Sequence, residues 1–458
     1  MSPASPRRYA VVGTGHRSEM YIRALLTSHA DVGSLVAWCD TNPVRMHYYD
    51  ELAAELAPGT ALPASYSADQ FEQMLDEAKP DALIVTTPDY LHSKYICAGL
   101  ARGLRVISEK PLTTDGEKAR AIADAASTSD GDVTVTFNYR YSPRNTLVKE
   151  LINSGEIGQV TSVHFEWLLD TGHGADYFRR WHREKDKSGG LLIHKASHHF
   201  DLVNWWLADA PRTVTALGAL RFYGAENARA RGDHHPGVTS RDLAADDPYR
   251  IDLAGNDRLR RLYLNAEHVD GYQRDRNVFG EPITIEDTMN VLVGYERGTQ
   301  LTYSLYAYAP WEGYRVAFNG TRGRIELDVV ESPHRAGKDE EIDPSARHEE
   351  ANNDKDSKPS EARTRGSRLL LQRHWERARE IPIPEGRGGH GGGDARLLDD
   401  IFRADGDDPL GHRAGWRAGL RSVAIGICAN ESMITGQSVP VASLGLPILD
   451  PAATRVSA

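Results

Sequence analysis

Val11-Val12-Gly13-Thr14-Gly15-His16-Arg17-Ser18, close to the start of the chain, is the stretch that decides the fold. It follows a short apolar run and precedes a helical pattern, which is the context in which a glycine-rich loop cradles the phosphates of a dinucleotide. Gly13 allows a tight turn, and Gly15 lets the backbone approach the phosphates at a helix N-terminus. Ser18 replaces the third glycine and is still small enough for helix–strand packing. A lone Gly-x-Gly also occurs in ordinary strand-to-helix turns, so the interpretation needs support from elsewhere in the chain.

Asp40 provides that support, because it ends the next apolar run, where an acid accepts hydrogen bonds from ribose hydroxyls. Thr41-Asn42-Pro43 offers no arginine for a 2′-phosphate, so the sequence favours NAD over NADP. On its own, Asp40 also fits a turn acid or a helix N-cap. The predicted cofactor contacts lie in the loop, at this acid and after the later strands: Gly13, Thr14, Gly15, His16, Asp40, Thr87, Pro88, His92, Glu109, Lys110 and Asn138.

Residues 1–142 have the pattern of one α/β domain. Short apolar runs alternate with helical patterns, which predicts a parallel sheet covered by helices on both faces. The expected strands are 9–12, 35–39, 82–86, 105–108 and 133–137, and the expected helices are 17–28, 43–57, 68–78, 90–103 and 115–128.

Residues 143–458 are expected to form a second domain, of the α+β class. Longer alternating runs follow a first helix at 144–154 and predict a large, open, mainly antiparallel sheet. Its expected strands are 160–169, 213–222, 288–295, 300–307, 314–319 and 323–329, with helices at 196–208, 394–403 and 411–435. Residues 224–282, polar except for a helical pattern near 256–268, indicate an insertion. Residues 334–366 are so poor in large apolar side chains that we expect a mobile surface loop.

The composition excludes several classes of partner. Of the 458 residues, 40% are hydrophobic and 26% charged, and the net charge of -11 argues against nucleic acids and anionic membranes. The three cysteines lack metal-ligand spacing and suit a reducing cytoplasm. The sequence shows no signal peptide and no membrane-spanning apolar run. We therefore expect a cytoplasmic protein without a metal and without nucleic-acid or membrane partners.

Two further motifs carry chemistry. Lys110 lies between Glu109 and Pro111 just past an apolar run, at the edge where open α/β sheets bind ligands. Beside a cationic nicotinamide its pKa should fall, since like charge and desolvation both disfavour an ammonium. In the Gly189–Asp201 stretch, His194, His198 and Asp201 have the spacing of one helix face. General acid–base catalysis fits best, with His198 taking a hydroxyl proton, while hydrogen-bonded core histidines and a zinc site remain alternatives.

Aromatic–polar clusters point to a carbohydrate ligand, because aromatic faces stack on sugar C–H surfaces while polar groups bond the hydroxyls. The predicted substrate-binding residues are Lys195, Asp201, Tyr139, Arg140, Trp181, His182, Tyr308 and His390. His390 opens a glycine-rich stretch before Asp394 that is either a connector or a loop that closes on the substrate.

Together and in this order, the Gly13 loop, Asp40, the Thr87–His92 stretch, Glu109-Lys110-Pro111 and the His198–Asp201 helix resemble the Gfo/Idh/MocA family of glucose–fructose oxidoreductase, inositol dehydrogenase and relatives. The resemblance implies an α/β Rossmann domain followed by an α+β domain. The open sheet of the second domain often makes homodimer or homotetramer contacts. The resemblance also implies NAD(P)-linked oxidation or reduction of sugars, inositols or similar polyols.

The resemblance also implies roles for individual residues. Lys110 matches the active-site lysine, His198 the catalytic histidine and Asp201 the acid one turn later. His194 is a departure, since many members have aspartate there, and it leaves the base open between His194 and His198. With Lys195 beside it, the change also fits an acidic or amide-bearing sugar.

The resulting prediction is an NAD-dependent dehydrogenase acting on a carbohydrate or cyclitol hydroxyl. One alternative is an NAD-dependent glycosidase resembling glycoside hydrolase family 109, in which a sugar C3 hydroxyl is oxidised transiently. The stretch that begins at His390 resembles one found there. A catalytically silent sugar-binding sensor on the same fold is the other alternative.

Overall fold

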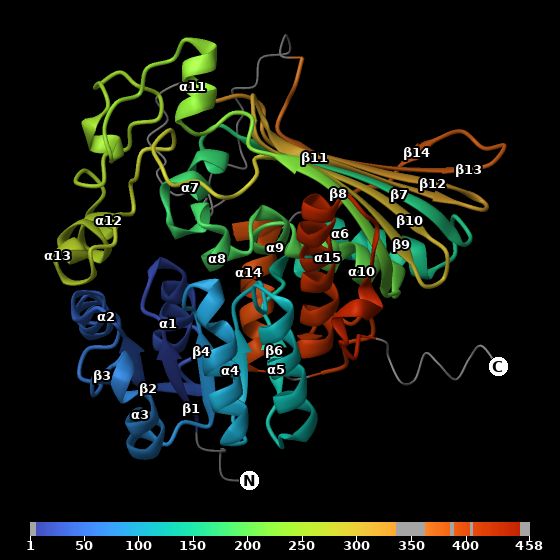
Figure 1. Cartoon of the computed structure of the whole chain (residues 1–458). Helices are drawn as coiled ribbons and strands as arrows, with labels where there is room; N and C mark the ends of the chain where they lie inside the picture. The colour runs from blue at the N-terminus through green and yellow to red at the C-terminus, as the bar shows by residue number, and fades with distance from the viewer. Residues whose placement is uncertain (1–5, 336–361, 385–388, 404–405, 449–458) are drawn as a thin grey trace.

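The computed structural model describes residues 6–335, 362–384, 389–403 and 406–448 (Figure 1). Its N-terminal part is a seven-stranded sheet, sheet A, in the order β15-β6-β5-β4-β1-β2-β3. The parallel strands are β1 (Arg7–Val12), β2 (Gly33–Asp40), β3 (Ala64–Ser67), β4 (Ala82–Val85), β5 (Arg105–Ser108) and β6 (Val133–Val135). Only the edge strand β15 (Ala414–Gly415) runs antiparallel. The predicted parallel sheet is confirmed, but β3 was missed, because its Ala-Ser-Tyr-Ser sequence at the sheet edge has no apolar run.

Helices cover both faces of sheet A (Figure 1). They are α1 (Glu19–Leu26), α2 (Pro43–Leu56), α3 (Phe71–Ala78), α4 (His92–Ala101) and α5 (Gly116–Thr128), joined by α14 (Gly389–Phe402) and α15 (Trp416–Thr435) from the end of the chain. The strand order reverses between β1 and β4, so the loops after these two strands separate and leave a crevice. Gly13 and Thr86 stand at this switch point.

The second part of the chain forms a nine-stranded open sheet, sheet B, in the order β14-β13-β12-β11-β7-β10-β9-β8-β16. Its strands are β7 (Val160–Asp170), β8 (Pro211–Ala219), β9 (Thr288–Tyr295), β10 (Gln300–Ala309), β11 (Glu312–Gly320), β12 (Gly323–Ser332), β13 (Gly366–Arg373), β14 (Arg379–Glu380) and β16 (Val439–Pro440). The sheet is antiparallel except for the β7–β10 pair. This confirms the predicted architecture, while β13 begins where the expected mobile loop ends; residues 336–361 of that loop lie outside the described residues.

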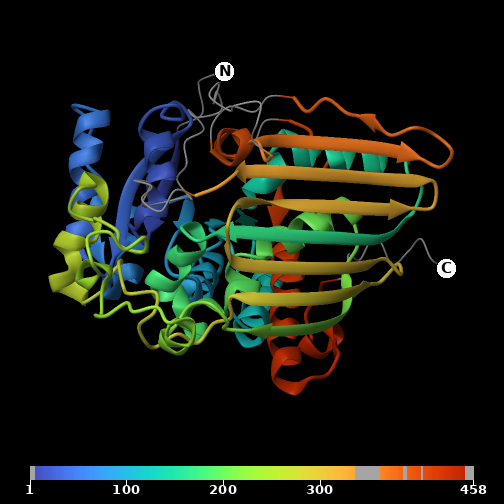
Figure 2. The same ribbon diagram turned by 90° about the horizontal axis from the view of Figure 1, so that it is seen from above.

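One face of sheet B packs on helices and the other is open (Figures 1 and 2). The covering helices are α6 (Pro143–Asn153), α10 (Ser197–Leu207) and α15. Trp167 and Trp206 fill the interface and are at most 1% exposed, whereas Leu217 and Leu292 on the open face are 74% and 56% exposed. Among the described helices, none combines the length and the apolar character needed to cross a bilayer.

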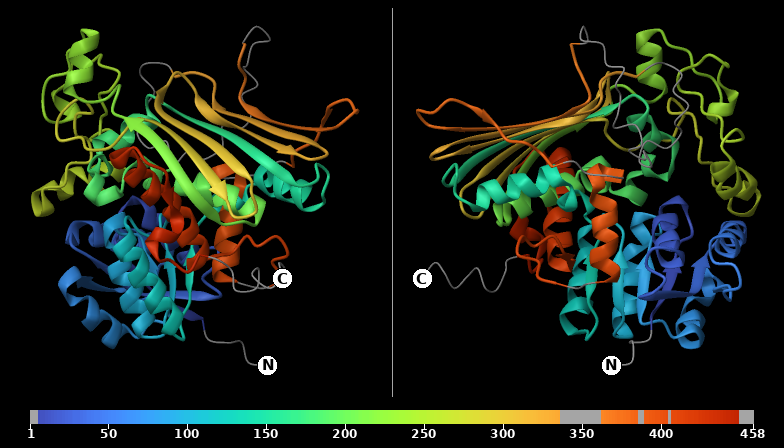
Figure 3. Two further views of the ribbon diagram at one scale, coloured as in Figure 1. Left: turned by 45° about the vertical axis from the view of Figure 1, so that its right-hand side comes forward. Right: turned by 180° about the vertical axis from the view of Figure 1, so that it is seen from behind.

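Residues 224–282, the predicted insertion, leave sheet B and run down beside the first domain (Figure 3). This inserted segment contains α11 (Ala225–Arg231), α12 (Asp257–Leu262) and α13 (Glu267–Asp270). Leu259 and Leu262 are fully buried in the same apolar cluster as Tyr49 of α2. The segment is therefore packed onto the domain that carries the glycine loop. Three short helices, α7 (His173–Arg179), α8 (Lys185–Ser188) and α9 (Leu191–His194), complete the junction between the two sheets.

Candidate active site

A cavity of about 960 Å³ lies between the carboxyl ends of the sheet A strands, the short helices α7 to α9 and the inserted segment. Most of the predicted site residues line it, although they come from positions far apart in the sequence. They are Gly13, Gly15, His16, Asp40, Thr87, Pro88, His92, Glu109, Lys110, Asn138, Tyr139, Trp181, His182, His194, Lys195 and His198.

The glycine loop turns sharply at Gly13, whose φ of +87° strains any residue with a side chain. A Cβ atom there would lie 2.7 Å from the Thr87 backbone nitrogen, so the loop also needs glycine for close approach to the neighbouring strand. Gly15 has an ordinary φ of -74° and would place a Cβ only 3.6 Å from the Tyr263 hydroxyl. The turn therefore requires glycine at position 13, whereas a methyl group at position 15 would meet the Tyr263 hydroxyl at an ordinary contact distance on the cavity lining.

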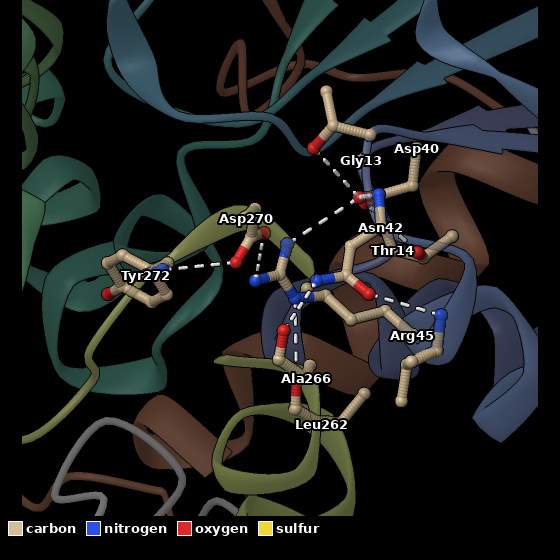
Figure 4. A network of polar contacts seen from close by, with 12 residues as sticks. Gly13, Thr14, Asp40, Asn42, Arg45, Leu262, Ala266, Asp270 and Tyr272 are labelled. Atoms are coloured by element: carbon tan, nitrogen blue, oxygen red, sulfur yellow. Dashed lines mark hydrogen bonds and ion pairs between the residues drawn. The ribbon is translucent and has the colours of Figure 1, made fainter. Parts of the chain in front are cut away.

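Asp40 faces the cavity at the end of β2 and is held by the chain around it (Figure 4). Its Oδ2 accepts from the Thr14 backbone nitrogen at 2.6 Å and from Thr14 Oγ1 at 3.0 Å. Its Oδ1 accepts from the Asn42 nitrogen at 2.8 Å, and the Arg45 guanidinium lies 3.6 Å away. Thr14, which was predicted to contact the cofactor, is fully buried and is not among the residues that line the cavity; it holds Asp40 in place.

The polar groups further along the cavity fit the other half of a dinucleotide. Thr87 Oγ1 and Asn138 Oδ1 are buried, line the cavity and have no hydrogen-bond partner among the described residues. A carboxamide or a ribose hydroxyl would satisfy such atoms. The two His92 ring nitrogens lie 2.7 and 2.9 Å from the Pro111 and Thr87 carbonyl oxygens, so the ring connects the loops that follow β4 and β5.

Lys110 follows β5 at the centre of the cavity. Its Nζ donates to the His194 carbonyl oxygen at 3.3 Å. The neighbouring Glu109 turns back and accepts from Arg17 at 2.5 Å and from Tyr21 at 2.7 Å. Burial lowers the pKa of Lys110, which is the direction that desolvation predicts. Glu109 is therefore bonded to residues that follow the glycine loop, whereas the Lys110 ammonium is bonded to the second domain.

His194 is paired with a carboxyl group for which the sequence predicted no role. Its Nδ1 lies 2.6 Å from Oδ2 of Asp89, which follows β4. Burial raises the pKa of Asp89 well above its usual value and lowers the pKa of His194 well below its own. Both shifts favour the uncharged pair, in which the imidazole can accept a proton. Asp89 stands in the Thr87–His92 stretch, but nothing in the sequence shows that this loop faces residue 194.

His198 lies on the same wall, and its ring stacks on Tyr139 with 4.5 Å between centroids. Lys195 Nζ donates to the Tyr139 hydroxyl at 3.3 Å, and burial lowers the pKa of Lys195 to about 8. The expected single helix is broken here, since α9 ends at His194 and α10 begins at Ser197. The two histidines nevertheless share the cavity.

Four predicted substrate-binding residues are not brought into the cavity by the described structure: three lie outside it, and the side chain of the fourth is not described. Asp201 takes Arg140 Nε at 2.7 Å and Nη2 at 2.6 Å, so these two buried charges neutralise each other outside the cavity. Tyr308 lies outside the cavity too, stacked on Phe222 at 4.7 Å. His390 falls at the start of α14, and its side chain lies outside the described residues.

Next to His194 the cavity contains a further polar group that the sequence reasoning missed, and its Tyr177 ring lies 5.5 Å from the His194 ring. His173, at the start of α7, approaches Glu312 of β11 at 2.6 Å and the Tyr177 hydroxyl at 3.0 Å, and all three residues line the cavity. His182 packs its ring 4.1 Å from that of His194. The sequence feature that could have identified His173 is the polar Thr-Gly-His-Gly stretch directly after β7. Among the described residues, no cluster of three or more His, Cys, Asp or Glu side chains could hold a metal ion.

Comparisons with known proteins agree with this geometry. Residues 7–137 match the model of an oxidoreductase family NAD-binding Rossmann fold, and residues 149–441 match the C-terminal alpha/beta domain of the same family. The chain belongs to the Gfo/Idh/MocA oxidoreductase family. Its membership confirms the resemblance seen in the sequence.

Individual relatives span most or part of the chain. YteT of Bacillus subtilis (strain 168), described as an oxidoreductase, is 36% identical over 89% of this chain and 91% of its own. Inositol 2-dehydrogenase of Rhizobium meliloti (strain 1021) is 28% identical over 46% of this chain and 58% of its own. A solved levoglucosan dehydrogenase in complex with NADH superposes with a TM-score of 0.63 and 16% identity, over 95% of this chain and 99% of that one. The last likeness shows the shared fold.

Proposed function

We propose that this protein is an NAD-dependent dehydrogenase that oxidises a hydroxyl group of a carbohydrate or cyclitol. The observation that carries the proposal is that Lys110, His194 and His198 line the same cavity as the Gly13 loop and Asp40. Relatives named inositol 2-dehydrogenase and levoglucosan dehydrogenase support this substrate class. The position of Asp40 at the end of β2 supports NAD over NADP, because a carboxylate there suits a ribose 2′-hydroxyl.

When bound, NAD supplies the pyridinium ring that takes the hydride from the substrate carbon. Lys110 donates to the substrate hydroxyl oxygen and stabilises the negative charge that develops there. His194 removes the hydroxyl proton. In the proposed tautomer Nδ1–H donates to the Asp89 carboxyl oxygen, so Nε2 is the ring nitrogen that accepts this proton, and Asp89 orients the imidazole. His198 and Lys195 orient the remaining hydroxyls.

A screen of monosaccharides, inositols and aryl glycosides with NAD tests the proposal. NADH accumulation with a free sugar or inositol supports it. Release of nitrophenol from an aryl glycoside without net NADH would replace it with the glycosidase alternative. Sugar binding without NADH formation or nitrophenol release would indicate the catalytically silent sugar-binding sensor instead.

We also propose that the protein forms a homodimer or homotetramer through the open face of sheet B. The exposed Leu217 and Leu292 on that face support the proposal, because self-association would remove them from water. Analytical ultracentrifugation tests it: a monomer at micromolar concentration would contradict it.

A further inference from the structure

The inserted segment docks on the end of the cavity that holds Asp40 (Figure 4). Asn42 Nδ2 donates to the Ala266 carbonyl oxygen at 3.0 Å. The His16 backbone nitrogen, in the glycine loop, donates to the Tyr263 hydroxyl at 2.9 Å. Since Leu262 is also fully buried, the segment is an integral wall of the adenosine end of the cavity.

Arg45 is the centre of this contact. Its Nη1 lies 3.6 Å from Asp40 Oδ1, and its Nη2 lies 2.7 Å from Oδ2 of Asp270 in the inserted segment. Its Nε donates to the Leu262 carbonyl oxygen at 3.3 Å. The side chain lines the cavity but is only 10% exposed, so its donors are already directed at protein acceptors.

This arrangement matters for the choice between the two nicotinamide dinucleotides. A carboxylate suits the ribose 2′-hydroxyl of NAD, whereas an arginine suits the 2′-phosphate of NADP. Arg45 stands beside Asp40, where a released guanidinium would offer a bidentate phosphate contact. With Asp270 in place, two carboxylates face one guanidinium, and the surplus negative charge opposes a phosphate dianion.

We infer that Asp270 is a cofactor-specificity residue: it holds the Arg45 guanidinium against Asp40 and thereby keeps it from a 2′-phosphate. The inference rests on the proposed function, because it assumes that a nicotinamide dinucleotide binds here. It assigns to the inserted segment a direct effect on the cofactor, although this segment is remote from the glycine loop in the sequence.

The test measures dissociation constants for NAD⁺ and NADP⁺ by isothermal titration calorimetry, without any substrate. Asp270→Asn keeps the size of the side chain and can still accept from the Tyr272 nitrogen, but it removes the charge. We expect the preference for NAD⁺ over NADP⁺ to fall by about tenfold in this variant, which corresponds to one charge-assisted hydrogen bond from Arg45 to the phosphate. Adding Arg45→Ala should return the NADP⁺ affinity to its lower value.

Asp257→Asn is the matched control, since Asp257 belongs to the same segment, is 67% exposed and pairs with Arg260 and Arg261. It should leave the preference unchanged. An unchanged preference in Asp270→Asn or an equal shift in the control would overturn the inference while the proposed function stands. A wild-type protein that binds both nucleotides equally would overturn the inference and the proposed preference for NAD, but not the proposed dehydrogenase reaction. If the wild-type protein binds neither nucleotide, both are wrong.

Discussion

The two ends of the cavity are built in different ways. At the adenosine end, Asp40 is fixed mainly by backbone nitrogens of Thr14 and Asn42, which belong to loops of the same sheet. At the proposed catalytic end, which holds Lys110 and His194, the imidazole is fixed by the Asp89 side chain and the ammonium by the His194 carbonyl oxygen, so each group depends on a partner from the other domain. Nearby loops of sheet A therefore fix Asp40 itself, although the inserted segment completes the wall around it, whereas Lys110 and His194 are fixed only after the two domains have packed.

The largest expected effect comes from removing the Lys110 amine. Lys110→Ala should lower kcat by about a thousandfold or more, because an electrostatic contact to the developing alkoxide is lost. NAD⁺ affinity, measured by calorimetry, should change little, since Asp40 and the glycine loop are intact. Lys118→Ala is the control, because Lys118 pairs with Asp115 on α5 outside the cavity. Full activity of Lys110→Ala would show that this residue has no catalytic role, and that the two ends of the cavity do not differ in the proposed way.

The next effect separates the two histidines. Asp89→Asn should lower kcat by about a hundredfold, because an amide in place of the carboxyl group no longer fixes the imidazole with Nε2 free to accept a proton. His194→Gln should cost at least as much, and His198→Gln less. The reverse order for the two histidines would make His198 the base. A pH–rate profile provides the second readout: the loss of Asp89 should move the acidic limb, whereas a purely structural defect would lower the profile without moving it.

The features that the sequence predicted correctly and those that it missed also differ between local and long-range contacts. The parallel sheet, the glycine loop and Asp40 could be predicted because strand, turn and helix signals are local. The role of Asp89 could not, since its partner is more than one hundred positions away. Asp201 has the helical spacing from His194 and His198 that predicted a place in the site. Its carboxylate is instead paired with Arg140, because a buried charge needs a partner of opposite sign. The Arg45–Asp270 contact was hidden in the same way, inside a segment whose polar composition shows only that it is an insertion.

Glycine substitutions in the loop distinguish fold from cofactor binding within the adenosine end. Gly13→Ala should destabilise the protein by about 1–3 kcal/mol, because its φ is +87° and the new Cβ would clash with the Thr87 nitrogen. Gly15→Ala should leave the melting temperature almost unchanged and weaken NAD⁺ binding instead, because its φ is ordinary and the methyl group enters the phosphate site. Differential scanning calorimetry and nucleotide titration give the two readouts. Equal melting temperatures for both variants would contradict the assignment of Gly13 to the fold.

The smallest expected effect concerns the free energy of unfolding, which the burial of the Lys195 ammonium should lower. Burial lowers the pKa of Lys195 to about 8, below that of an unfolded lysine, so between these values the unfolded chain binds more protons than the folded one. The destabilisation is therefore complete below pH 8 and is relieved as the pH rises toward 10. Lys195→Met removes the titrating group. Its advantage over the wild type in urea unfolding should shrink with rising pH, by at most about 1.4 kcal/mol per pH unit. A constant difference for Lys195→Met across this pH range would mean that burial does not perturb the titration of Lys195 in the folded protein.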